Sequence, residues 1–239
     1  MSLWTQRIEV RWQQNLRFYE HRYEVLRAFE DGGYLRSLRE REERIFVRVG
    51  TAHQLVTFGP RGMSLALLRP DADETLVRTA ASEVWERLQP RVTGGLRLGF
   101  QWLRELSEPY AEARKSAARS LLGEPFSDDA EDFALLFDGK KDDPAARYRL
   151  ELGVLEASEV PARLARQSGR VAKADLNTPP TLWQVSSLPS VALFCDQEWD
   201  TADLDDSALP TVLGRIQAVR RAADNVVDNI ASRVESEPR

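Results

Sequence analysis

The stretch HQLVTFGPRGMSLALL, residues 53–68, decides the fold of this 239-residue chain. Its two runs, His53–Phe58 and Met63–Leu68, are rich in apolar residues, and the turn sequence GPRG separates them. Proline and glycine favour tight turns, so the pattern predicts an antiparallel hairpin. A third run, Arg44–Val49, alternates apolar and polar residues just upstream and extends the hairpin to a three-stranded meander.

Helical patterns flank this meander on both sides. Apolar residues at spacings of three and four predict one helix over about Leu16–Glu30 and another from Asp71 to Pro90. Further strands are predicted before the first helix, at Arg7–Trp12, and after the second, at Val92–Leu106. This order predicts an α+β fold in which helices cover one face of a mainly antiparallel sheet.

The second half of the chain carries a looser version of the same layout. Ser107-Glu108-Pro109 interrupts the pattern, and we therefore expect two sheet-plus-helix halves, residues 1–107 and residues 108–239. A long helix over residues 206–235 closes the chain. Its apolar stripe is close to heptad spacing and is longer than core cover requires, which predicts a homodimer through this helix.

Four segments resemble an uncharacterised, sporadically distributed bacterial family built from two α+β halves. They are IEVRW (8–12), HQLVTFGPRGMSLALL (53–68), TLVRTAASEVWERL (75–88) and VTGGLRLGFQWLREL (92–106). In the last segment, Phe100-Gln101-Trp102 stands where the family pattern has Tyr-Ile-Asn. The resemblance implies the two-half fold and no particular activity, and the family's patchy distribution suggests a link to mobile elements or phage defence.

Composition narrows the classes of function. Apolar residues make up 42% of the chain, which is enough for a folded core. The chain has one cysteine, two histidines and no glycine-rich phosphate loop, so most metal, nucleophile and nucleotide sites lack their usual residues. We expect no cofactor, and we interpret Cys195 as a structural thiol because neither His21 nor His53 lies in a motif that points to it.

Apolar runs and the cysteine count together predict the cellular compartment. The N-terminal segment has no apolar run of the kind that a signal peptide carries, and no stretch approaches 18 apolar residues. A single cysteine suits a reducing compartment. We therefore expect a cytoplasmic protein without membrane contact.

Charge is distributed unevenly along the chain. Residues 1–107 carry 17 arginines against 14 acidic residues and residues 108–239 carry 16 basic against 24 acidic residues, so the net charges are +3 and −8. Arginines of the predicted meander favour an anionic partner, and Tyr34 and Phe46 beside them are suited to stacking on bases. The alternative is a solvated strand face with Arg–Glu pairs. The candidate binding residues are Arg36, Arg39, Arg41, Arg44 and Arg48.

A cluster of carboxylates follows the last predicted strand. Asp196, Glu198 and Asp200 have the i, i+2, i+4 spacing that begins a Ca²⁺ loop, but Thr201 and Ser207 stand where that loop needs glycine and glutamate. On a strand, the same three side chains share one face and are suited to hold Mg²⁺ for phosphoryl chemistry. The alternative is a solvated strand end whose acids favour the N-terminus of the following helix.

Trp4 and Trp199 lie outside any buried pattern, and exposed tryptophans often anchor interfaces, so both are candidate contact residues. These features favour a non-enzymatic binding or adaptor protein that acts through protein–protein contacts. Two alternatives stay open. One is a nucleic-acid-binding protein that uses the arginines of the first half, and the other is a metal-dependent hydrolase at the acidic cluster of residues 196–206.

Overall fold

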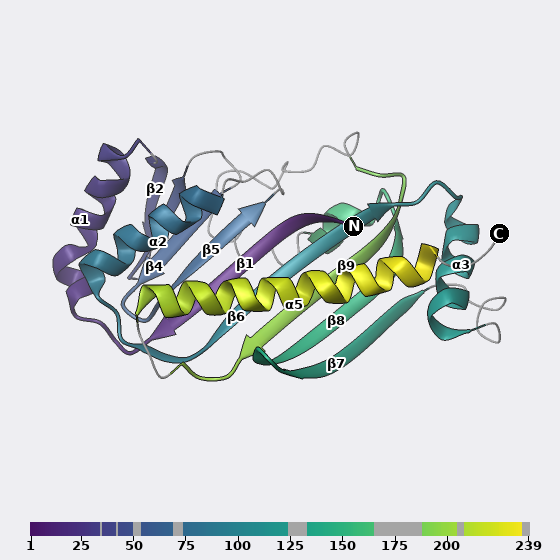
Figure 1. Cartoon of the computed structure of the whole chain (residues 1–239). Coiled ribbons are helices and arrows are strands. Elements are labelled where there is room, and N and C mark those ends of the chain that lie inside the picture. Colours follow the sequence, from purple (N-terminus) through teal and green to yellow (C-terminus); the bar gives the residue numbers. More distant parts are fainter. Residues whose placement is uncertain are drawn as a thin grey trace.

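A single antiparallel sheet forms the centre of the molecule (Figure 1). The computed structural model describes residues 1–33, 35–41, 43–49, 54–68, 74–123, 133–164, 188–204 and 208–235. Within them, nine strands follow the order β2-β3-β4-β5-β1-β6-β9-β8-β7. The strands are β1 (Ser2–Trp12), β2 (Leu35–Arg41), β3 (Arg44–Val49), β4 (Gln54–Gly59), β5 (Gly62–Leu68), β6 (Val92–Glu105), β7 (Ala134–Asp142), β8 (Ala145–Glu156) and β9 (Val191–Thr201).

Helices cover one face of this sheet. They are α1 (Arg17–Asp31), α2 (Glu74–Leu88), α3 (Tyr110–Leu122) and α5 (Leu209–Glu235). In Figure 1, α5 runs across the front of the sheet, α1 and α2 lie at its left end, and α3 lies at its right end. A short helix at 160–164 packs with a small second apolar cluster that includes Leu103 and Phe194. None of the described helices is long and apolar enough to cross a membrane.

The hairpin that the sequence predicts is confirmed as β4 and β5, with Gly59 opposite Gly62 at the turn. Both glycines are needed where they stand, because a Cβ at Gly59 would lie 2.9 Å from the carbonyl oxygen of Glu43 and a Cβ at Gly62 would lie 2.7 Å from that of Val10. The mixed α+β class is also confirmed. The described strands form one sheet in place of the two expected, because β6 pairs with β1 on one side and with β9 on the other and so joins the two halves.

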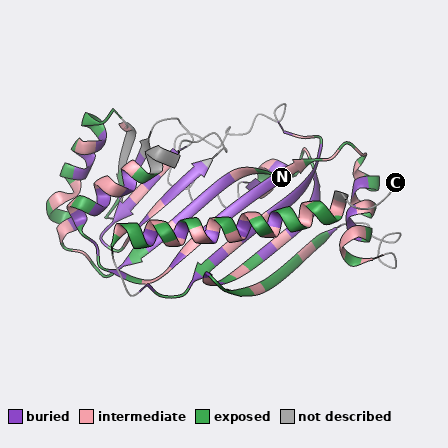
Figure 2. Cartoon of the chain, viewed as in Figure 1, coloured by how far each residue is buried: buried purple, intermediate pink, exposed green. Residues whose placement is uncertain are grey.

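The main apolar core lies between the sheet and the helices. Alternation along each strand builds it, because every second side chain points to the same face. In β6 these residues are Leu96, Leu98, Phe100 and Trp102, all at most 2% exposed. Figure 2 shows the result, with the central strands buried and the outer side of α5 exposed.

The apolar stripe of α5 packs against this core. Val212, Val219, Ala223 and Val227 are buried in the same cluster as the sheet residues. Polar contacts fix the helix along its length, as Gln197 donates to the Ala223 carbonyl (3.3 Å) and Arg220 donates to Gln6 (3.1 Å). The stripe therefore packs within the chain. The homodimer was expected because the stripe is longer than core cover requires, and that reason does not hold.

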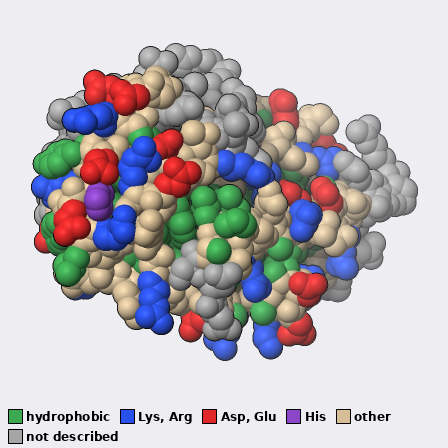
Figure 3. Space-filling model, turned by 60° about the vertical axis from the view of Figure 1, so that its left-hand side comes forward, with side chains coloured by type: hydrophobic (Ala, Val, Ile, Leu, Met, Phe, Trp, Pro, Cys, Tyr) green, Lys and Arg blue, Asp and Glu red, His purple; other side chains and the backbone are tan. Residues whose placement is uncertain are grey.

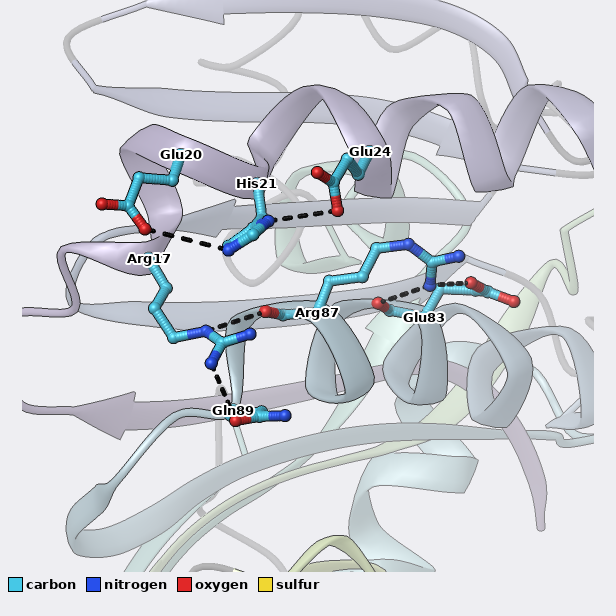
Figure 4. Close-up of polar contacts among 7 residues, drawn as sticks. All are labelled: Arg17, Glu20, His21, Glu24, Glu83, Arg87 and Gln89. Carbon is cyan, nitrogen blue, oxygen red and sulfur yellow. Dashed lines mark hydrogen bonds and ion pairs between the residues drawn. The ribbon is translucent and has the colours of Figure 1, made fainter.

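Asn15, which precedes α1, and Arg17, its first residue, cap the last turn of α2 (Figure 4 draws the Arg17 contacts). Arg17 Nε donates to the Arg87 carbonyl (3.2 Å), and its Nη1 donates to Gln89 Oε1 (2.9 Å). Asn15 Nδ2 donates to the Leu88 carbonyl (2.8 Å). These donors satisfy carbonyls that have no partner within a helix end, and they fasten the two helices to each other.

The first prediction concerns the core. Replacing Leu98, which is fully buried, by alanine is expected to lower the free energy of unfolding by about 2–5 kcal/mol, because it removes apolar contacts and leaves a cavity. Leu136→Ala is the matched control, since Leu136 is 61% exposed and its loss should change stability by at most about 0.5 kcal/mol. Urea denaturation measures both. Equal effects of the two substitutions would contradict this core.

Candidate functional site

The second face of the sheet carries charged residues in register. We call it the polar face and define it by Arg7, Glu9, Arg97, Glu198 and Asp200, which alternate with core residues on β1, β6 and β9. Two cross-strand rows run over it. The outer row is Glu9, Arg97, Asp200, Arg147 and Lys140, and the inner row is Arg7, Gly99, Glu198, Arg149 and Asp138.

One ion pair joins two neighbours of the outer row. Arg97 Nε lies 3.1 Å from Asp200 Oδ1. Partial burial alone would lower the pKa of Arg97, but the charge and hydrogen bond of Asp200 outweigh it and the pKa is raised. The Arg97 guanidinium therefore stays charged, and its hydrogen bond to Asp200 is a charge-assisted contact of this face.

The inner row contains a buried guanidinium. The side chain of Arg7 is only 5% exposed and lies 3.6 Å from Glu9 and 3.9 Å from Glu198. Arg7 and Glu198 are separated by the strand β6, where Gly99 is opposite both. Because Gly99 has no side chain, the two charged groups can meet across the strand. At the row's other end, Arg149 Nε lies 3.1 Å from Asp138 Oδ1.

Gln101 organises the polar groups next to these rows. Its side chain is fully buried, accepts from Thr5 Oγ1 (2.8 Å) and donates to Asp196 Oδ2 (2.9 Å) and to the Arg163 carbonyl (3.1 Å). Arg163, from the short helix, forms an ion pair with Glu151, which stands opposite Asp196. Of the two carboxylates that the register places side by side, Glu151 thus pairs with a cation and Asp196 accepts from Gln101.

Three hollows lie along one rim of this face, the rim to which β1 and β9 point in Figure 1. Their volumes are about 520, 330 and 610 Å³. The first and second share Arg97 and Asp200, and the second and third share Arg11. We call this row of three neighbouring hollows the rim groove. It crosses the sheet from β7 to β4, about 29 Å at ~4.8 Å per strand, which suits an extended segment of roughly nine residues.

The carboxylates proposed as a metal site share one face of β9, as their alternation predicts. They do not converge, because Asp196 accepts from Gln101, Glu198 lies by Arg7 and Asp200 pairs with Arg97. Among the described residues, no group of three or more His, Cys, Asp or Glu side chains is placed to hold a metal ion. Metal binding here stays a prediction.

The candidate arginines of the first half lie in β2 and β3, at the end of the sheet opposite β7. Backbone register places Arg41 opposite Arg44, Arg39 opposite Phe46 and Arg48 opposite Ser37. Arg44 is exposed and lines the third hollow. The side chains of four of the candidate residues lie outside the described part of the chain: Arg36, Arg39, Arg41 and Arg48.

The expected exposure of Trp199 is wrong. Its side chain is fully buried, stacks on Tyr148 at 4.6 Å between ring centroids and donates from Nε1 to Gln197 Oε1 (2.8 Å). The reason is that β9 continues to Thr201, so residue 199 falls on the core side of the strand. Trp4 is half-buried against the second apolar cluster.

Cys195 and His21 occupy structural positions. The Cys195 thiol is buried in the core, and this burial raises its pKa to about 12. His21 lies on α1, where Nδ1 is 3.1 Å from Glu24 and Nε2 is 3.8 Å from Glu20 (Figure 4). Cys195 thus lies in the core and His21 lies on α1, where it contacts Glu20 and Glu24. The two residues form no nucleophile–base pair.

No protein-family model matches this chain, and no curated protein matches it in sequence. The resemblance to the bacterial two-half family therefore stays an expectation.

Sequence reasoning missed the residues that line the rim groove on β6, β7 and β8. Arg97 alternates with Leu96 and Leu98, and Arg147 and Arg149 flank Tyr148 in the same way. This alternation was a visible signal of a polar strand face. The alternation does not reveal which strands are neighbours. The strand order is what brings Arg97, Asp200 and Arg147 into one row.

The state of Cys195 gives a second prediction. At about pH 8 the folded protein should not react with dithionitrobenzoate, because the thiol is buried and protonated, whereas the chain in urea should react fully. An unfolded thiol ionises near pH 8.5, so between about pH 8.5 and 12 the unfolded state binds fewer protons than the native state and stability falls as pH rises.

The Cys195→Ala variant is the control for this pH dependence. It removes the titrating group and should flatten the decline of the urea midpoint over that pH range. Rapid reaction of the folded wild-type protein would contradict the buried position of Cys195.

Proposed function

We propose that this chain is a non-enzymatic binding protein and that the rim groove receives an extended segment of a protein partner. The observation that carries the proposal is the groove itself, whose charged lining residues lie on the polar face, opposite the core that the helices cover. The helices pack on the apolar face of the sheet. The charged side chains along the rim of the polar face take no part in that packing.

The signs of the lining charges favour a polypeptide over a nucleic acid. The basic residues that line the groove are Arg11, Arg44, Arg61, Arg97, Lys140, Arg147 and Arg149, and the acidic ones are Glu9, Glu43, Asp138, Glu198 and Asp200. A phosphate backbone would meet a carboxylate at almost every step and would be repelled there. A polypeptide can carry both signs and match them.

Other surfaces of the molecule have the same mixed character. Figure 3 shows acidic and basic side chains interspersed over the side that α1 occupies, with no wide patch of a single sign. Interspersed charges give specificity in protein–protein contacts and disfavour sequence-independent attraction to polyanions.

The third prediction tests the groove with matched double variants. Immobilised wild-type protein is exposed to a nuclease-treated lysate of its native host, and the retained proteins are compared with those of Arg11→Glu/Arg44→Glu. Both residues are exposed and line the groove, so reversal of their charge should reduce retention of the true partner at least tenfold.

Arg221→Glu/Arg233→Glu makes the same change of charge at exposed positions of α5 on the other side of the sheet and should retain the partner. An identical set of proteins from both double variants would contradict the proposal. Retention of proteins from an untreated lysate but not from the nuclease-treated one would make nucleic acid the ligand and would also contradict the proposal.

A further inference from the structure

One pair of like charges stands on the floor of the first hollow. The β7–β8 register places Lys140 directly opposite Arg147, and both side chains lie on the polar face and line that hollow. Like charges directly opposite each other on neighbouring strands destabilise a sheet. The arrangement therefore has a small cost in the free energy of folding and leaves two cations side by side.

The acidic residues of the hollow do not offset it, because each has another basic partner. Asp200 pairs with Arg97 (3.1 Å), Asp138 pairs with Arg149 (3.1 Å), and Glu198 lies 3.9 Å from Arg7. Lys140 has a contact to Asp142 at 3.3 Å. That pair is 72% and 95% exposed, so water and salt screen it strongly.

Arg147 is left over from this pairing. Its side chain is exposed, and among the described residues it takes part in no hydrogen bond or ion pair. Backbone register places Arg147 in the outer row between Lys140 and Asp200, and the Asp200 carboxylate is already bound by Arg97. The hollow thus has surplus positive charge at one place, the Arg147 guanidinium with the Lys140 ammonium beside it.

We propose that Arg147 and Lys140 form a subsite for one carboxylate of an acidic side chain in the partner segment. This inference rests on the proposed function and names the chemistry of its ligand at one end of the groove. Arg147 can donate two parallel hydrogen bonds to a carboxylate, and Lys140 can donate a third. A phosphate dianion fits less well, because Asp138, Glu198 and Asp200 line the same hollow and would repel its second charge.

A synthetic peptide probe gives the fourth prediction. Fluorescently labelled octaglutamate and octaglutamine are titrated with the full chain at low ionic strength, and fluorescence anisotropy gives both dissociation constants. Octaglutamate should bind at least fivefold more tightly than octaglutamine. Arg147→Gln should weaken octaglutamate binding at least fivefold, and Arg221→Gln, at an exposed position of α5, should leave it within twofold of wild type.

Stability of the same variants separates binding from a structural role. Arg147→Gln should leave the urea midpoint unchanged or raise it, because it ends the opposition to Lys140. A lower midpoint would show that Arg147 supports the fold and would overturn the proposal. So would equal binding of the two peptides, or displacement of octaglutamate by inorganic phosphate beyond that by chloride of equal ionic strength.

The outcomes also separate this inference from the proposed function. If the Arg11→Glu/Arg44→Glu variant loses the partner but octaglutamate binding does not depend on Arg147, the groove function stands and the subsite is wrong. If octaglutamate binding depends on Arg147 but the Arg11→Glu/Arg44→Glu variant retains the partner as wild type does, the subsite stands and the groove function is wrong.

Discussion

The pairing of β6 with β1 on one side and β9 on the other is the constraint on which the rest of the structure depends. β6 spans 14 residues and is the only link in the described sheet between strands of the first and second halves. Its alternation sends Leu98 and Phe100 to the helices and Arg97 and Gln101 to the polar face. One strand therefore fixes both the core and the row of charges that the proposed function uses.

The position of α5 follows from this arrangement and explains why function is assigned to the opposite face. A helix of 27 residues, about 40 Å long, uses its apolar stripe to cover the centre of the sheet. Gln197 and Arg220 add directional hydrogen bonds that fix its register on the strands. Because α5 covers the apolar face, the charged face of the sheet is the one whose side chains are available to contact a partner.

Much of the fold could be predicted from local patterns. The hairpin at residues 53–68 and the helix at 206–235 are found as β4–β5 and as α5, because strong periodicity and turn residues act over a few neighbours. β2 escaped prediction because four of its seven residues are charged. Trp199 was misplaced because acidic neighbours on both sides hid the end of β9. The rim groove depends on strand order, which no local pattern encodes.

The rim groove lies on an accessible face, and arginine-selective labelling tests this placement most directly. Arg7 and Arg11 lie on the same strand and on the same face, but their side chains are 5% and 69% exposed. Treating the full chain with phenylglyoxal and measuring each adduct by mass spectrometry should show rapid labelling of Arg11, together with Arg147 and Arg149, and slow labelling of Arg7. Labelling of Arg11, Arg147 and Arg149 as slow as that of Arg7 would contradict the account.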